Sequence, residues 1–388
     1  MIQTASMFSQ ILALFSRGEF AQIIHKHQAE KHNKGYTCWD QFVAMLFCQL
    51  AQAQSLREIC GGLVCCLGKL RHLGIHAAPN KSTLSYANSK RPWQVYQDLF
   101  YTMLDKCQQV AKNHQHRFRF KNKLFSLDAS VIDLCLSLFE WATFRQTKGA
   151  VKLHLMLDHD GYLPVYALIT EGSIHEVNVA RSLEFPKGSI IVIDRGYNDY
   201  DLYGRWTYQG IYFVTRMKTN AKYKVVEKRK PPKNRNVLAD EIIEFSGVDA
   251  LVNCPYLLRR IVVWDVEKEK EIVFLTNHLK FGATTISQIY KDRWQIETFF
   301  KILKQNLKVK TFVGTTPNAL KTQIWTALIT ILILKYLQLS SKWSWSMSNL
   351  VALLRWNLFT YRDLWCWIND PFDTPPLLPE IIQLEFDL

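Results

Sequence analysis

The nine cysteines of this 388-residue chain include no Cys-x-x-Cys pair. Its first residues also lack the basic, apolar and small-residue regions of a signal peptide. Together these absences argue against a secreted scaffold held by disulfides and predict reduced, mostly buried thiols in a cytosolic protein.

A long uninterrupted apolar run is also missing. The most apolar stretch begins at Ile324, and Lys335 interrupts it after eleven residues. A helix needs about 20 apolar residues to cross a bilayer. We therefore predict a buried core helix from about Ala319 to Leu339.

Acidic residues are scarce relative to basic ones. The 34 Asp and Glu face 48 Lys and Arg, which gives a formal net charge of +14 at pH 7. This balance favours a polyanionic partner, most commonly nucleic acid, although a basic surface can also be indifferent. The 48% apolar content is enough for two or three folded units.

The first part of the chain, residues 1–115, carries helical signals and is predicted to be a helical N-terminal domain that binds DNA. A capping box, Ser55-Leu56-Arg57-Glu58, starts one short helix, and Lys81-Ser82-Thr83-Leu84 opens another. Two such helices are typical of a helix-turn-helix, but the same spacing occurs in any small helical bundle.

Residues 116–215 change to short apolar or alternating runs typical of strands, with helical segments between the later ones. The turn Asp158-His159-Asp160-Gly161 predicts that the first three strands form an antiparallel meander, and the last two are predicted to be parallel additions. The fold class is therefore α/β, with a mixed sheet.

Residues 216–282 are predicted to form a β-rich insertion. Its first twenty residues are strongly basic and contain one acid, Glu227. This segment is either a solvated loop or a contact to a phosphate backbone. After it, residues 283–340 are assigned to the remainder of the catalytic domain, and the Trp-rich residues 341–388 to a C-terminal helical tail that contacts a partner.

Residues 290–304 are predicted to form one helix with two different faces. At about 100° per residue, Arg293, Glu297 and Lys304 fall with Tyr290 within an arc of about 60°. An apolar stripe lies beside this arc and would anchor the helix on a core. The stripe consists of Ile289, Ile296, Phe299, Phe300, Leu303 and Leu307.

Two further acids end apolar strands: Asp128 in Phe-Ser-Leu-Asp and Asp194 in Ile-Ile-Val-Ile-Asp. Either alone could be a helix N-cap or a turn residue. With Glu297, however, they could bind two divalent cations that activate an attacking hydroxyl and steady the departing oxygen. Three carboxylates without Cys or His favour Mg²⁺ or Mn²⁺ over zinc.

These residues resemble the DDE transposases of bacterial insertion sequences, specifically the insertion-sequence-four family. Tyr290, Arg293, Glu297 and Lys304 match that family's Tyr-x2-Arg-x3-Glu-x6-Lys signature at every spacing. Asp128 and the segment from Asp194 match its other two acidic motifs. The resemblance implies an RNase H-like core with a β-rich insertion, preceded by an all-helical domain.

The same resemblance implies roles for single residues. Asp128, Asp194 and Glu297 would be the catalytic residues and would bind two metal ions. Contacts to DNA would come from the signature and its helix, where Trp294 either stacks on an unpaired base or packs at the core's rim. The resemblance assigns Tyr290, Arg293 and Lys304 to DNA, and the helical angles add Lys301, Lys308 and Trp294. Trp264 is the insertion's candidate for holding a flipped base.

The resulting expectation is a transposase that cleaves the ends of its element and joins the freed 3′-hydroxyls to target DNA. Its partners would be terminal inverted repeats, target DNA and a second copy of itself in a synaptic homodimer. It would act in the bacterial cytoplasm at the nucleoid. Two alternatives remain open: an RNase H-like nuclease or resolvase without strand transfer, and a non-catalytic DNA-binding protein derived from a transposase.

Overall fold

The computed structural model describes most of the chain as two compact units. The described residues are 5–31, 33, 35–66, 68–112, 117–135, 137–145, 148–232, 236–307 and 311–377. Unit 1 combines Met1–His114 with Lys301–Leu388, and unit 2 is Gln115–Phe300. The predicted division placed residues 283–340 with the catalytic core, whereas the contacts group the part from Lys301 onward with the N-terminal helices.

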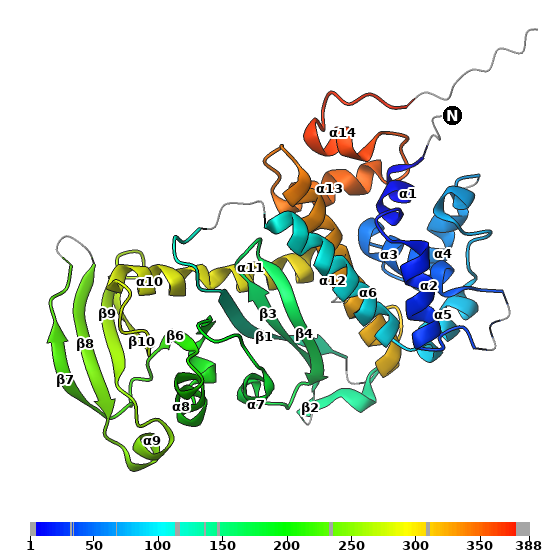
Figure 1. The fold of residues 1–388 in the computed structure, drawn as a ribbon. Coiled ribbons are helices and arrows are strands. Elements are labelled where there is room, and N and C mark those ends of the chain that lie inside the picture. Colours follow the sequence, from blue (N-terminus) through cyan, green and yellow to red (C-terminus); the bar gives the residue numbers. More distant parts are fainter. Residues whose placement is uncertain are drawn as a thin grey trace, which may run out of the picture. The chain divides into compact units, whose positions relative to one another are not determined.

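Unit 1 is helical (Figure 1). Its elements are α1 (Met7–Leu12), α2 (Arg17–Lys26), α3 (Cys38–Ala51), α4 (Leu56–Val64), η1 (Leu70–Leu73), α5 (Lys81–Lys90), α6 (Gln94–Ala111), α12 (Pro317–Ser340), α13 (Met347–Asn357) and α14 (Leu364–Asn369).

Helix α12 forms the core of unit 1. Thr316 caps its N-terminus and Pro317 occupies the first turn, a combination that favours helix initiation. Among the described residues it is the one helix long and apolar enough to cross a membrane, yet 78% of its apolar window is buried inside the protein. Trp325 is fully buried and stacks on Trp93 with ring centroids 6.2 Å apart. The prediction of a buried core helix is confirmed.

Helices α4 and α5 do not form a helix-turn-helix with a tight turn. The connection between them covers residues 65–80 and contains the short helix η1. A helix-turn-helix uses a turn of about 3–4 residues. Ser55 does cap α4, as predicted, by accepting a hydrogen bond from the Glu58 backbone.

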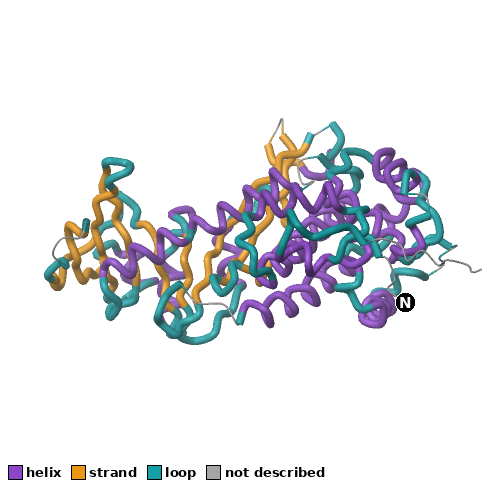
Figure 2. The backbone as a smooth tube through the Cα atoms, turned by 90° about the horizontal axis from the view of Figure 1, so that it is seen from above, coloured by secondary structure: helices purple, strands orange, loops and turns teal. Residues whose placement is uncertain are grey.

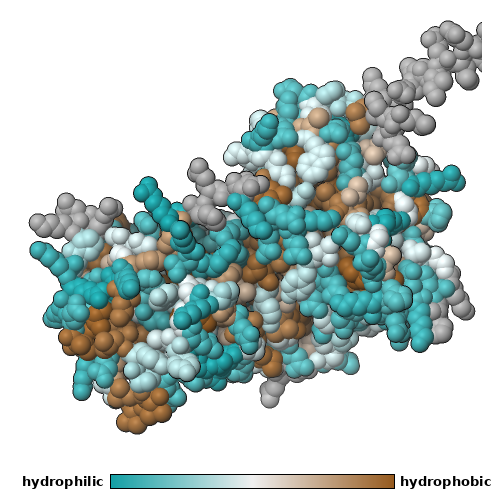
Figure 3. All heavy atoms as spheres, viewed as in Figure 1, coloured by the Kyte–Doolittle hydropathy of each residue, from teal (hydrophilic) through white to brown (hydrophobic). Residues whose placement is uncertain are grey.

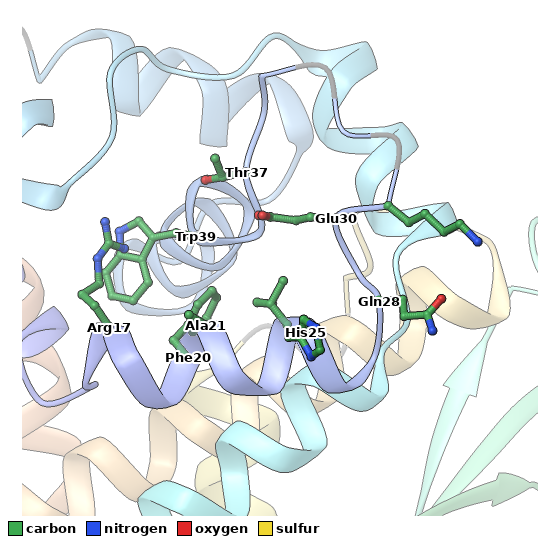
Figure 4. A pocket seen from close by; sticks show the side chains of 10 residues that line it. Arg17, Phe20, Ala21, His25, Gln28, Glu30, Thr37 and Trp39 are labelled. Carbon is green, nitrogen blue, oxygen red and sulfur yellow. The ribbon is translucent and has the colours of Figure 1, made fainter.

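The surface of unit 1 has a pocket between α2 and the start of α3 (Figure 4). The Arg17 guanidinium lies 3.7 Å from the centre of the Trp39 ring, and Phe20 packs edge-on against the same tryptophan. The indole nitrogen of Trp39 donates to the Leu73 carbonyl at 2.9 Å. These contacts hold α2, α3 and η1 together.

The tryptophans of the C-terminal tail divide into two groups. Trp345 and Trp367 are buried in unit 1, with ring centroids 5.3 Å apart. Trp343, Trp356 and Trp365 are exposed. Partner contact stays a prediction for the exposed group, because the buried pair packs against its own chain.

Unit 2 is built on one ten-stranded mixed sheet in the order β2-β3-β1-β5-β6-β10-β9-β8-β7, with β4 also paired to β3 (Figures 1 and 2). The strands are β1 (Leu124–Leu134), β2 (Thr143–Arg145), β3 (Lys148–Asp158), β4 (Leu163–Glu171), β5 (Ile190–Ile193), β6 (Tyr212–Arg216), β7 (Tyr223–Arg229), β8 (Val237–Phe245), β9 (Leu258–Asp265) and β10 (Lys270–Thr276). The helices are η2 (Glu140–Ala142), α7 (Glu176–Ser182), η3 (Arg195–Tyr197), α8 (Tyr200–Tyr208), α9 (Val248–Asn253), α10 (Ala283–Asp292) and the first part of α11 (Trp294–Asn306).

The strand pairings confirm the predicted mixed sheet. Strands β1, β3 and β4 are antiparallel neighbours, and β5 and β6 are added in parallel to β1. The β-rich insertion continues this sheet, because β10 pairs antiparallel with β6. It is therefore an extension of the core sheet and not a separate one.

Helices cover both faces of the sheet (Figure 1). On one face, α10 buries Ala283, Ile286 and Ile289 against Leu124, Val192 and their neighbours. On the other, α7 and α8 pack on the side chains that alternate with these along the strands. Polar side chains at the ends of these strands are therefore attached to a packed core, which fixes their positions.

The insertion exposes apolar side chains on α9 (Figure 3). Val248 and Val252 are among the most exposed large apolar side chains of the described residues. The opposite side of α9 packs against α8, where Gly204 faces the backbone of Asn253. This contact ties the insertion to the core.

A side chain at Gly204 is predicted to destabilise unit 2. A Cβ there would lie 2.0 Å from the Asn253 backbone oxygen, so the two helices must separate. We expect Gly204→Ala to lower the free energy of unfolding by about 1–3 kcal/mol in urea denaturation. Gly61→Ala in α4 is the control, since nothing lies within 4 Å of its Cβ. Equal urea midpoints for the two variants would contradict the close approach.

Candidate active site

Asp128 and Asp194 are brought together by strand register. Strands β1 and β5 are parallel, and Leu127 is paired with Ile193. An aspartate directly follows each of these two residues. Alternation along the strands places both carboxylates on the face that α10 covers. The predicted convergence of these acids at one edge of the parallel strands follows from this register.

Asp128 does not end its strand, contrary to the prediction. Strand β1 runs on to Leu134 because it stays paired with β3, and Asp128 lies opposite Leu155. What ends near Asp128 is the parallel pairing with β5. The prediction therefore placed the end of the strand at the point where β1 loses β5 as a neighbour.

The environment of Asp128 opposes its ionisation. Its side chain is 16% exposed, and burial raises its pKa to about 7 although Arg293 and the Ala129 backbone N–H favour the charged form. The charges of Asp194 and Glu297 raise the pKa further. These electrostatic interactions indicate that the three predicted ligands form one charged group.

Asp194 also has the capping role that was the alternative reading. One carboxylate oxygen accepts a hydrogen bond from the Gly196 backbone at 2.7 Å and so caps η3. The carboxylate is half-buried. Capping fixes its orientation next to Asp128.

The predicted single helix over residues 290–304 is broken at Arg293. Helix α10 ends at Asp292, α11 begins at Trp294, and the Arg293 backbone N–H bonds to Tyr290, three residues back. The apolar stripe predicted for the helix is nevertheless confirmed, since all six of its members are buried.

Arg293 is buried between two carboxylates. One terminal nitrogen lies 3.1 Å from Asp128 Oδ2, and the other donates to Glu297. Burial acts to lower the pKa of Arg293, but Tyr290, Asp128 and Glu297 raise it above its ordinary value. The arginine therefore remains charged and holds Asp128 and Glu297 in one ion-paired group.

The other predicted DNA contacts lie in different surroundings. Tyr290 packs on Phe274 with ring centroids 5.1 Å apart, and burial raises its pKa. Trp294 is 60% exposed, Lys301 is exposed and Lys304 is half-buried. Lys308 lies outside the described residues. Lys301 and Lys304 lie on the part of helix α11 that belongs to unit 1.

A buried hydrogen-bonded chain next to these acids was missed by the sequence reasoning. His159 links Ser126 Oγ, 2.7 Å from Nε2, to Asp292 Oδ2, 2.6 Å from Nδ1. Arg117 and Tyr162 also donate to Asp292. This chain joins β1, the β3–β4 turn and the end of α10. The sequence signal was limited to a turn at His159 and an acid next to Arg293.

A fourth acid, Glu176, was also missed. A Cβ built on Gly196 would lie 3.0 Å from Asp194 Oδ1 and 3.5 Å from Glu176 Oε2, so the two carboxylates flank this glycine. The neighbouring Tyr197 is fully buried, and within the described part of the chain its hydroxyl has no hydrogen-bond partner. Only the position of Glu176 at the start of a short helix between two strands could have suggested it.

The donor set suits a hard divalent cation. The candidate ligand atoms are carboxylate oxygens. Beside them lies the buried Tyr197 hydroxyl, which has no hydrogen-bond partner among the described residues. Among the described residues, no three His, Cys, Asp or Glu side chains are grouped closely enough to hold a metal as they stand. Arg293 occupies the position between Asp128 and Glu297.

Comparison with known proteins identifies the family. A family model described as Transposase DDE domain matches residues 119–333, the region that contains Asp128, Asp194 and Glu297. The chain belongs to the DDE transposases. A second model, a domain of unknown function (DUF4372), matches residues 3–76 of unit 1.

Proteins named as transposases are similar over most of this transposase. One from Sinorhizobium fredii is 27% identical over 74% of this chain and 80% of its own length. One for an insertion sequence element of Geobacillus stearothermophilus is 27% identical over 66% of this chain and 67% of its own. A solved piggyBac transposase synaptic complex with hairpin DNA aligns at 11% identity with a TM-score of 0.44, covering 97% of this chain and 84% of that one.

Membership establishes the general activity. The protein is an insertion-sequence DNA transposase, an enzyme of the DDE type. The family implies dependence on a divalent metal and action on DNA. The described geometry adds that Asp128 lies on β1, that Asp194 directly follows the adjacent β5, and that Arg293 links Glu297 on α11 to Asp128.

Removing the central histidine of the buried chain is predicted to destabilise the site's support. His159→Leu leaves Ser126 Oγ without this partner and takes one donor from Asp292. We expect a loss of about 1–3 kcal/mol in the free energy of unfolding, measured with urea at neutral pH.

His175→Leu is the matched control, because His175 is exposed and makes no capping bond at α7. Its stability should stay within about 0.5 kcal/mol of the unmodified transposase. If His159→Leu is equally neutral, the hydrogen-bonded chain does not stabilise the fold.

Proposed function

We propose that this transposase holds two Mg²⁺ or Mn²⁺ ions with Asp128, Asp194 and Glu297, cleaves the ends of its insertion sequence and joins the freed 3′-hydroxyls to target DNA. The observation that supports the proposal best is the register of β1 and β5, which makes Asp128 and Asp194 neighbours. The ion pairs of Arg293 connect Glu297 to the same group.

Each acid of the site would have its own role in phosphoryl transfer. Bound divalent ions would activate the attacking water or hydroxyl and stabilise the departing oxygen. Asp128 has a raised pKa because burial disfavours its charged form, and a nearby cation would stabilise that form. Asp194 is oriented by its cap on η3, and Glu297 by its bond with Arg293.

The DNA contacts are proposed for the signature residues and their helix. Lys301 and Lys304 would bind backbone phosphates near the cleaved bond, and Lys308 is predicted to do the same. Arg293 could contact a phosphate only after releasing a carboxylate, and Tyr290 only through its hydroxyl edge, since its ring packs on the core. Exposed Trp294 is available for stacking on an unpaired base.

Other parts of the transposase are proposed to complete the DNA complex. Trp264 on β9 is exposed and could hold a flipped base. The helical N-terminal part would bind the terminal inverted repeats, and two copies would pair the element's ends as a homodimer. This activity would take place on nucleoid DNA in the bacterial cytoplasm.

Loss of Asp194 is predicted to separate chemistry from DNA binding. We expect Asp194→Ala to abolish Mg²⁺-dependent cleavage of end DNA while changing end binding little, because this carboxylate serves the metal. Cleavage is measured on labelled end DNA, and binding by gel shift. Asp201→Ala, a surface change on α8, is the control and should retain both. Cleavage by a well-folded Asp194→Ala protein would remove Asp194 from the site.

Loss of Lys304 is predicted to weaken DNA binding in a salt-dependent way. One lost phosphate contact should reduce the slope of log affinity against log salt by about 0.9. Affinities for end DNA are measured between low and moderate salt for Lys304→Ala and for Lys187→Ala, an exposed lysine of unit 2. Identical slopes for Lys304→Ala and the unmodified transposase would place Lys304 away from the phosphates.

A further inference from the structure

We propose that Glu176 is a fourth carboxylate of the metal centre, where it shares a divalent cation with Asp194. The proposal rests on the two-metal function described above and adds a ligand that the three acidic motifs of the family do not include.

Glu176 is placed at the centre by the start of α7, the helix between β4 and β5. One of its oxygens, Oε1, lies 3.4 Å from Nζ of Lys152 on β3, and Lys152 also donates to the Ile174 carbonyl at 2.8 Å. The lysine side chain is 11% exposed. This contact fixes one side of the carboxylate and leaves Oε2 toward Gly196.

Asp194 and Glu176 both lie against Gly196, a residue that has no side chain. Their oxygens lie 3.0 and 3.5 Å from the position of a Cβ on Gly196. Two carboxylates that lie against the same residue repel one another unless a cation lies between or beside them. Lys152 supplies positive charge on the Glu176 side. Arg293 pairs with Asp128 and Glu297, so an ion held by Asp194 and Glu176 does not compete with it for the same carboxylates.

Tyr197 provides an independent sign of a missing ligand. It is fully buried, its hydroxyl has no hydrogen-bond partner among the described residues, and it interacts electrostatically with Asp128, Glu176 and Asp194. A buried hydroxyl without a partner is unfavourable. A hydrated cation among these acids would supply a water to bond with it, because Mg²⁺ keeps several of its waters in protein sites.

The four carboxylates would form one site for hard cations, and this site has two sides. Asp194 and Glu176 form one side, and Asp128 and Glu297, joined by Arg293, form the other. We infer that the first ion binds at the Asp194 side, since ion binding at the other side requires Arg293 to move.

The test is Mn²⁺ binding to the full-length transposase without DNA, measured by isothermal titration calorimetry. We expect Glu176→Gln to weaken the tightest Mn²⁺ site at least tenfold. Glu184→Gln, the same change at an exposed position after α7, should stay within twofold of the unmodified transposase. Melting curves in EDTA verify that each variant is folded.

The Lys152→Gln variant tests whether Glu176 binds the metal or only stabilises the fold through its ion pair. It breaks the same ion pair as Glu176→Gln but retains the carboxylate. As a ligand, Glu176 should keep or increase Mn²⁺ affinity in Lys152→Gln, because a competing cation is gone. Equal losses of affinity in Lys152→Gln and Glu176→Gln would overturn the proposal.

Asp194→Asn distinguishes failure of this proposal from failure of the two-metal function. If Asp194→Asn loses Mn²⁺ binding while Glu176→Gln stays within twofold of the unmodified transposase, Glu176 is not a ligand and the three-acid site stands. If the unmodified transposase itself binds no Mn²⁺, both proposals fail.

Discussion

The ion pairs of Arg293 are the interaction on which the architecture of this site depends. Asp128 is largely buried beside other acids, and this burial raises its pKa because it disfavours the charged form. The guanidinium offsets this cost and joins β1 to α11 through Glu297. Arg293 lies at the junction of α10 and α11, four residues before Glu297, so its two terminal nitrogens contact an acid of the sheet and an acid of its own helix.

The surrounding structure supports this arrangement from several directions. The chain from Ser126 through His159 to Asp292 holds the end of α10 on the sheet one residue before Arg293. The parallel register of β1 and β5 sets Asp194 next to Asp128. A DDE transposase must hold several negative charges close together before its metal and DNA arrive, and buried cationic and polar partners make this possible.

Much of the fold could be predicted because it depends on local pattern. Alternating apolar residues gave the strands, their order gave the antiparallel meander with parallel additions, and the stripe from Ile289 to Leu307 gave the buried side of the helices. The break at Arg293 could not be predicted from helical periodicity, because the apolar stripe continues across it from Ile289 to Leu307. The length of β1 and the grouping of α12 with N-terminal helices depend on neighbours far away in the chain.

The sequence by itself determined that this protein is a basic, mixed α/β DDE transposase with Asp128, Asp194 and Glu297 as its candidate ligands. Residue identity and spacing carry that information directly. Only the tertiary structure decided that Arg293 pairs with Asp128, that His159 supports Asp292, and that Glu176 and Asp194 both lie against Gly196. Each of these relations joins segments that are distant in sequence, and long-range packing, not local spacing, brings their side chains together.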